Sequence, residues 1–227
     1  MAKQRITRKK LLKEPDEFIT TTGKIIAWSR EYQHHVIYGA IGFFALIIIV
    51  AGARFVSENN ENKATMLLQK AVEKYQAAME SDDSGNVFSE VQSDFDTLMT
   101  KYAGKSAGKL ATLTYGNICY KAGETDKAIR AYEKSVSIFK ATSLYPLAVN
   151  GLAYAYEQKK DFPNALKYYK ILADDATSVL TDMALFNMGR LYKLTGESEK
   201  SIDAYQKLLM DYPDSIYAEV VDVDVSV

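Results

Sequence analysis

The side chains that most often carry chemistry are scarce in this chain of 227 residues. Its two histidines, His34 and His35, are adjacent, and a metal site would need further ligands that are not evident nearby. Cys119 is the one cysteine, so the chain can form no internal disulfide, and no plausible histidine base accompanies it. No glycine-rich phosphate loop follows a predicted strand. We therefore expect no catalytic residues, no metal and no cofactor, and we interpret Cys119 as a small core residue.

The elements that would position any site begin with an apolar stretch, Val36 to Val56. It carries no charge from Val36 to Ala53, and as a helix it would extend about 31 Å, close to the hydrocarbon thickness of a bilayer. A core helix of a soluble protein would show a polar face, which this stretch lacks. We interpret it as a transmembrane helix. The alternative is a cleaved signal peptide, because Ala51-Gly52-Ala53 fits the small-residue cleavage pattern.

Charge divides the chain into a basic head and an acidic body. Residues 1–35 hold eight Lys or Arg against four acids, whereas residues 57–227 hold 19 against 25. Basic residues close to a span tend to stay in the cytoplasm, so Lys24 and Arg30 predict a cytoplasmic head and an extracytoplasmic body in the inner membrane of a bacterium. The acidic body argues against a nucleic-acid partner. Within the head, Glu14-Pro15-Asp16-Glu17 is typical of a helix start, and we expect a short amphipathic helix that lies on the membrane or docks a partner.

The body repeats itself at a period of 36–37 residues. Four aromatic residues recur at intervals of 37, 37 and 36: Phe95, Tyr132, Tyr169 and Tyr205. Small residues recur 16 positions before the last three: Gly116, Ala153 and Gly189. A two-helix unit of this length predicts an α-solenoid, in which small residues let two helices approach and the aromatic fills the gap between hairpins. The first unit lacks the small residue and is expected to be cap-like. The segment Val220–Val227 alternates in a way that is not typical of a helix, and we expect a frayed or truncated terminal helix there.

The predicted fold class is all-α, an N-terminal transmembrane helix followed by hairpins at about 58–104, 107–141, 144–177 and 180–213. The recurring segments KAIRAYEKSV, NALKYYKILA and KSIDAYQKLL, with Tyr212-Pro213 after the last, resemble the tetratricopeptide repeat family. That resemblance implies a peptide-binding groove lined by the first helix of each hairpin. In the register above, the groove residues are Leu110, Leu113, Asn117, Tyr120, Leu147, Asn150, Tyr154, Glu157, Met183, Phe186, Arg190 and Lys193.

This set forms an apolar strip beside a polar edge, which suits an extended or helical peptide. Alternatively, some of its members pack against the helix expected at 58–80. Leu113 and Gly151 stand where repeats of the carboxylate-clamp type carry Lys and Asn. We therefore do not expect this groove to bind the C-terminal carboxylate of a chaperone.

The whole layout resembles the YfgM-type family of ancillary subunits of the SecYEG translocon. The resemblance rests on the basic head, the single span and the small acidic repeat body. It implies a membrane-anchored adaptor that holds chaperones or secreted chains near the translocon exit, with protein partners and no enzymatic activity. Two alternatives stay open: a scaffold for another envelope machine, such as cell division or cytochrome maturation, and a free secreted repeat protein if the apolar stretch is cleaved.

Overall fold

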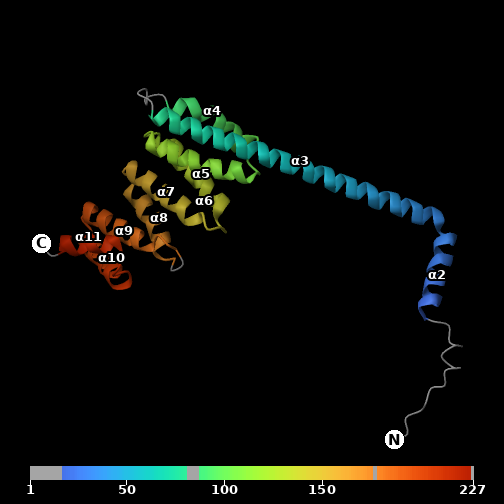
Figure 1. Ribbon diagram of the computed structural model, residues 1–227. Coiled ribbons are helices and arrows are strands. Elements are labelled where there is room, and N and C mark those ends of the chain that lie inside the picture. Colours follow the sequence, from blue (N-terminus) through green and yellow to red (C-terminus); the bar gives the residue numbers. More distant parts are fainter. Residues whose placement is uncertain (1–16, 81–86, 176–177, 226–227) are drawn as a thin grey trace, which may run out of the picture. The chain divides into compact units, whose positions relative to one another are not determined.

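The computed structural model describes residues 17–80, 87–175 and 178–225, and these fold into helices joined by short turns (Figure 1). The chain divides into two compact units, Met1–Glu58 and Asn59–Val227. The helices are α2 Glu17–Glu31, α3 Gln33–Glu80, α4 Val87–Thr100, α5 Ser106–Lys121, α6 Thr125–Phe139, α7 Tyr145–Gln158, α8 Phe162–Ala173, α9 Thr181–Thr195, α10 Ser198–Asp211 and α11 Ile216–Val225. The all-helical fold class predicted from the sequence is confirmed within the described residues.

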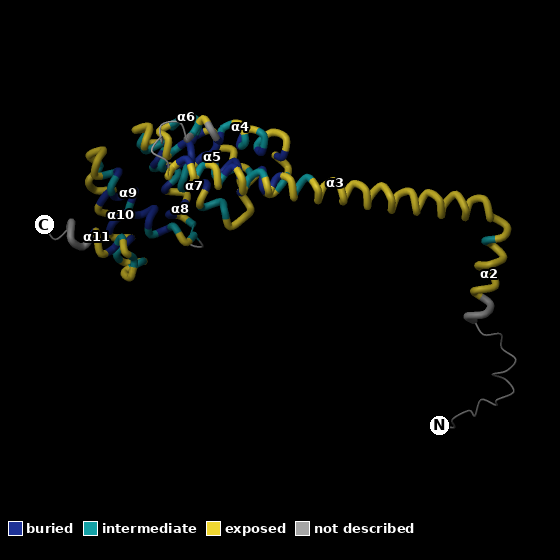
Figure 2. Tube along the Cα trace, turned by 45° about the horizontal axis from the view of Figure 1, so that its top comes forward, coloured by how far each residue is buried: buried dark blue, intermediate teal, exposed yellow. Residues whose placement is uncertain are grey.

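The first unit consists of α2 and the N-terminal part of α3. The predicted helix in the head is present as α2, although its expected start at residues 14–16 lies outside the described residues. Every residue from Val36 to Val56 is exposed (Figure 2), and a window of α3 reaches a mean hydropathy of 2.5 with none of it buried. A helix of this length and composition can cross a membrane, and a signal sequence near an N-terminus has the same properties.

The second unit is a row of helical hairpins, α5/α6, α7/α8 and α9/α10, that follow one another in chain order (Figure 1). Their inner turns are built alike. A residue with positive φ closes each first helix: Gly123 at 75°, Lys160 at 63° and Gly196 at 82°. The next amide N–H then donates to a carbonyl five residues earlier, as from Glu124 to Cys119 at 2.9 Å. The repeat seen in the sequence is therefore also a repeat of backbone geometry.

The recurring aromatics fill the positions expected of them. Phe95, Tyr132, Tyr169 and Tyr205 are all buried. The ring of Tyr132 lies so close to the Cα atoms of Gly116 and Gly151 that a Cβ at either position would overlap it. Gly116 belongs to the same hairpin as Tyr132, whereas Gly151 belongs to the next one. Small residues thus admit the aromatic both within a hairpin and between hairpins.

The first hairpin differs from the prediction in one respect. The end of α3 does present small residues to the core, because Ala64, Ala71 and Ala78 are buried at a spacing of seven residues. Ala78 lies one position before residue 79, where the repeat register expects the small residue and where Met79 is half exposed. The register position therefore lacks the small residue, as the sequence indicates, and alanines outside the register enter the core instead. The expected loop at 81–86 lies outside the described residues.

The C-terminal segment, where the sequence predicts a frayed or truncated helix, is helical as far as Val225. Residues 216–225 form α11, which packs against α9 and α10. Ala218 and Val221 are buried and lie three residues apart, on one face of the helix. Burial of that face outweighs the preference of valine for strands, because tertiary packing routinely overrides local propensity.

Candidate functional site

The predicted groove residues of the first two complete hairpins converge on one cavity between α5 and α7. The cavity has a volume of about 280 Å³. Its lining comprises Leu113, Asn117, Tyr120, Tyr132, Leu147, Asn150, Gly151 and Tyr154. Six of these come from the set proposed on the sequence, whereas Tyr132 and Gly151 do not. Tyr132 is one of the recurring aromatic residues of the repeat, and Gly151 is the glycine against which its ring packs.

The groove is uncharged. No carboxylate, ammonium or guanidinium of the described residues lines it. Burial raises the pKa of the Tyr120 phenol, as do the nearby Glu157 and Tyr154, so this hydroxyl stays protonated at neutral pH. Leu113 is buried at its floor, and Leu147 is 48% exposed. An apolar side chain of a ligand could lie against these two leucines.

Polar atoms at the groove are only partly satisfied. The hydroxyl of Tyr132 donates to Asn117 Oδ1 at 2.7 Å, which orients that amide. The Oδ1 atom of Asn150 is buried and accepts no hydrogen bond from any residue that the structure describes. A buried acceptor without a donor costs about 1–3 kcal/mol. An N–H group supplied by a bound chain would relieve that cost.

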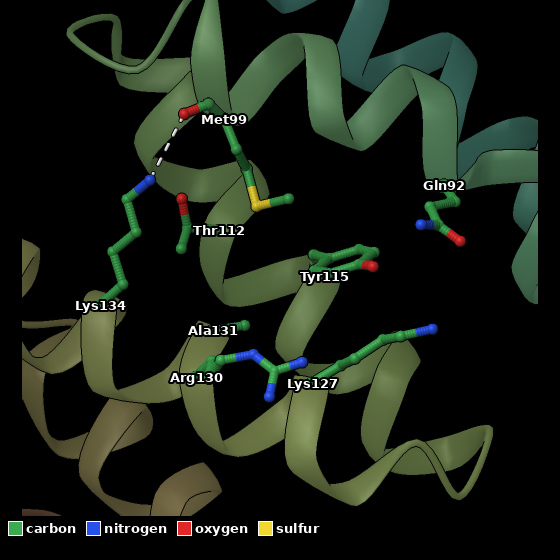
Figure 3. A pocket seen from close by; sticks show the side chains of 8 residues that line it. All are labelled: Gln92, Met99, Thr112, Tyr115, Lys127, Arg130, Ala131 and Lys134. Atoms are coloured by element: carbon green, nitrogen blue, oxygen red, sulfur yellow. Dashed lines mark hydrogen bonds between the residues drawn. The ribbon is translucent and has the colours of Figure 1, made fainter.

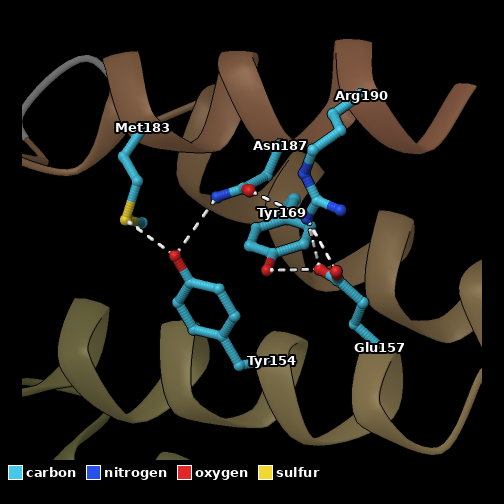
Figure 4. A network of polar contacts seen from close by, with 6 residues as sticks. All are labelled: Tyr154, Glu157, Tyr169, Met183, Asn187 and Arg190. Atoms are coloured by element: carbon cyan, nitrogen blue, oxygen red, sulfur yellow. Dashed lines mark hydrogen bonds and ion pairs between the residues drawn. The ribbon is translucent and has the colours of Figure 1, made fainter. Parts of the chain in front are cut away.

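Two other predicted groove residues, Glu157 of the second hairpin and Arg190 of the third, instead bind each other (Figure 4). Nη2 of Arg190 lies 2.7 Å from both carboxylate oxygens of Glu157, and the hydroxyl of Tyr169 donates to Glu157 Oε2 at 3.1 Å. These contacts join α7, α8 and α9. Glu157 is therefore held by two partners within the chain, and the contacts tie the second hairpin to the third.

The same network continues toward α9 through neutral groups. The side-chain N–H of Asn187 donates to the hydroxyl of Tyr154 at 3.4 Å, and that hydroxyl lies 3.7 Å from the sulfur of Met183 (Figure 4). Met183 is itself buried. Tyr154 therefore has two roles, because its ring lines the groove while its hydroxyl anchors α7 to α9.

The remaining predicted residues lie outside the α5–α7 cavity. Phe186 packs against Tyr217 of α11 and Tyr205 of α10, with ring centroids 5.2 and 6.3 Å apart, so α11 covers this part of the predicted strip. Leu110 is exposed near the start of α5, and Lys193 is exposed in the last turn of α9. The open groove is thus shorter than the sequence predicted, since α11 packs over its third unit.

The helix at 58–80 does approach the groove. A second cavity of about 400 Å³ lies between the end of α3 and α5, and its lining includes Val72, Tyr75, Thr114 and Asn117. Asn117 lines both cavities. The α3 segment therefore lines a separate cavity that adjoins the groove at Asn117. The register of the repeats could not show this, because α3 departs from it.

The described side chains that could bind a metal or act as a nucleophile lie apart from the groove. Within the described ranges there is no group of three or more His, Cys, Asp or Glu side chains that could hold a metal ion. Cys119 is buried in α5, where burial raises the pKa of its thiol to about 11. A thiol with that pKa is almost entirely protonated at neutral pH and is a poor nucleophile.

Comparison with known proteins agrees with this architecture. A family model described as a tetratricopeptide repeat-like domain matches residues 27–225, which include the apolar stretch as well as the hairpins. No individual curated protein matches the sequence.

Proposed function

Because this chain belongs to the tetratricopeptide repeat-like domain family, we propose that it is a membrane-anchored adaptor that binds segments of other proteins in the α5–α7 groove. Domains of this family generally mediate protein–protein interaction. The observation that carries the proposal is the uncharged cavity of about 280 Å³ at which the buried Oδ1 of Asn150 accepts no hydrogen bond from a described residue. The role is binding and does not involve catalysis.

The groove favours an extended, uncharged peptide with an apolar side chain. Leu113 and Leu147 offer apolar surface, while Asn117 and Asn150 lie beside it as amide groups able to bond a peptide main chain. A charged ligand residue would lose its hydration here without gaining an ion pair. Segments of this kind are exposed in chains that have not yet folded, which fits an adaptor for protein translocation or for assembly of envelope proteins.

The anchor is the apolar part of α3. This helix is continuous from Gln33 to Glu80, and the family match spans the apolar stretch together with the hairpins. A basic head before the stretch places the head in the cytoplasm and the repeats outside it. The layout resembles the YfgM-type subunits, so the translocon is the proposed partner machine and secreted chains or chaperones are the proposed ligands.

Leu147 provides the test of the groove. Its side chain is 48% exposed, so Leu147→Glu should leave the fold stable while placing a charge in the uncharged groove. Ile202→Glu is the matched control, because Ile202 is 54% exposed on α10, away from the groove. Tagged full-length protein would be purified in mild detergent, and captured proteins would be identified by mass spectrometry.

We expect the unmodified chain and the Ile202→Glu control to retain translocon subunits, secreted chains or chaperones, and Leu147→Glu to lose the chains that bind the groove. Capture of cell-division or cytochrome-maturation proteins instead would assign the adaptor to another envelope machine. Equal capture by all three proteins would reject the groove as the binding site.

A further inference from the structure

A third cavity, which is basic, lies on the side of α5 opposite the α5–α7 groove. It has a volume of about 350 Å³ and is lined by residues of α4, α5 and α6. Thr112 and Tyr115 form its α5 wall, and they point about 150° away around the helix from Leu113 and Asn117 of the groove, given 100° per residue. The two cavities therefore open on different faces of the repeat body.

Among the residues that the structure describes, three cations line this cavity and no carboxylate does. Lys127, Arg130 and Lys134 extend into it from α6, while Gln92 and Met99 face them from α4 (Figure 3). The body as a whole carries 25 acids against 19 basic residues between 57 and 227. A purely basic lining within an acidic domain forms a local attraction for anions.

The contacts that these cations make within the chain leave some of their N–H groups available to a ligand. Nζ of Lys127 lies 3.2 Å from Glu124, and Nζ of Lys134 donates to the carbonyl of Met99 at 3.4 Å. Arg130 is exposed and makes no hydrogen bond or ion pair with the described side chains. Asp126, which lies four residues before it, binds Lys159 at 2.8 Å.

We propose that this cavity binds an acidic segment of a partner protein, with Arg130 as its central anion-binding residue. Its cations are spread along α6 at positions i, i+3 and i+7, a rise of about 10 Å. A single phosphate could not meet all three. In an extended chain, side chains on one side recur every ~7 Å, so successive carboxylates can meet cations spaced in this way.

The rest of the lining fits the same ligand. Met99, Ala131 and the ring of Tyr115 give an apolar floor between the cations, which suits the aliphatic part of glutamate or an intervening apolar side chain. Burial, the neighbouring Cys119 and more distant acids all raise the pKa of Tyr115, so its hydroxyl remains a hydrogen-bond donor. No backbone N–H nest of the kind that cradles phosphate is needed for such a ligand.

The probe is a five-residue peptide of alternating glutamate and leucine, blocked at both ends, and its control replaces each glutamate with glutamine. Binding to the full chain in non-ionic detergent would be measured by calorimetry at low salt. We expect the glutamate peptide to bind at least tenfold more tightly, and that advantage to fall as salt rises. Arg130→Gln should weaken the binding of the glutamate peptide about tenfold.

Lys140→Gln is the matched control, since Lys140 is exposed at the end of α6, outside the cavity, and the variant removes one charge as well. It should change the affinity less than twofold, and both variants should melt like the unmodified protein. Equal binding of the two peptides, or equal losses in the two variants, would overturn the proposal. Inorganic phosphate that binds more tightly than the peptide, and loses affinity in Arg130→Gln, would show a site for small anions instead.

Discussion

Tyr169 offers the sharpest test of how the hairpins are held together. Its side chain is fully buried where α7, α8 and α9 meet, its ring packs edge-on against Tyr154 with centroids 5.8 Å apart, and its hydroxyl donates to Glu157. Tyr169→Ala removes the ring and leaves a cavity that the neighbouring helices cannot fill. We expect a loss of about 3–5 kcal/mol, the range for deleting a large buried aromatic side chain.

Two further variants separate the contribution of the Tyr169 hydroxyl from that of its ring and compare Tyr169 with its neighbour. Tyr169→Phe removes only the hydroxyl, and since Glu157 keeps both contacts with Arg190, the loss should be about 1 kcal/mol. Tyr168 is the adjacent residue of the same type, but it is half-buried and stacks on Tyr156 with centroids 5.6 Å apart. Tyr168→Ala should therefore cost about 1–2 kcal/mol.

Thermal melts of the full chain in detergent, followed by helical circular dichroism, would measure these losses. In a domain of this size 1 kcal/mol shifts the midpoint by about 2–4 °C, so Tyr169→Ala should melt roughly 6–20 °C lower. Both flanking hairpins should be destabilised, because each repeat is supported only by its neighbours. A loss for Tyr168→Ala as large as that for Tyr169→Ala would refute the repeat register and the groove derived from it.

Four further outcomes are expected. Lys160→Gly should stabilise the protein by about 1 kcal/mol in chemical denaturation, because φ of 63° strains a lysine and suits glycine. Gly151→Ala should destabilise the protein and weaken peptide binding, because its Cβ would overlap the Tyr132 ring beneath the groove. Cys119 should react about a hundredfold more slowly with iodoacetamide at pH 8 than a thiol of pKa 9, because burial raises its pKa to about 11. Since the unfolded thiol ionises first, that group should also lower stability as pH rises from about 9 toward 11. The mature protein should begin at Met1 or Ala2 and resist carbonate extraction; a mature N-terminus near Arg54 would instead show that the apolar stretch is a cleaved signal.

The sequence predicted the repeat because its determinants are local. Small residues and aromatics at fixed spacing within one hairpin specify how two helices approach, and that spacing recurs along the chain at Gly116, Ala153 and Gly189. The same register brought Leu113 and Asn150, and likewise Asn117 and Tyr154, to one cavity, since residues one repeat apart on first helices become neighbours when hairpins stack. Periodicity therefore sufficed for the fold and for the α5–α7 part of the candidate site.

Some contacts between helices do not follow from the repeat register, and only the tertiary structure reveals them. The ion pair between Glu157 and Arg190 depends on the angle at which α7 and α9 pack, which their spacing in the sequence does not specify. The covering of Phe186 by Tyr217 depends on α11, whose valine-rich sequence favours a strand and whose helix exists because one of its faces is buried. The basic cavity likewise needs α4 and α6 both to pack against α5, and only that packing places Gln92 and Met99 opposite Arg130. The local sequence pattern determined which helices form and which faces they bury. The length of the groove and the presence of the basic cavity were decided by how those helices pack together in space.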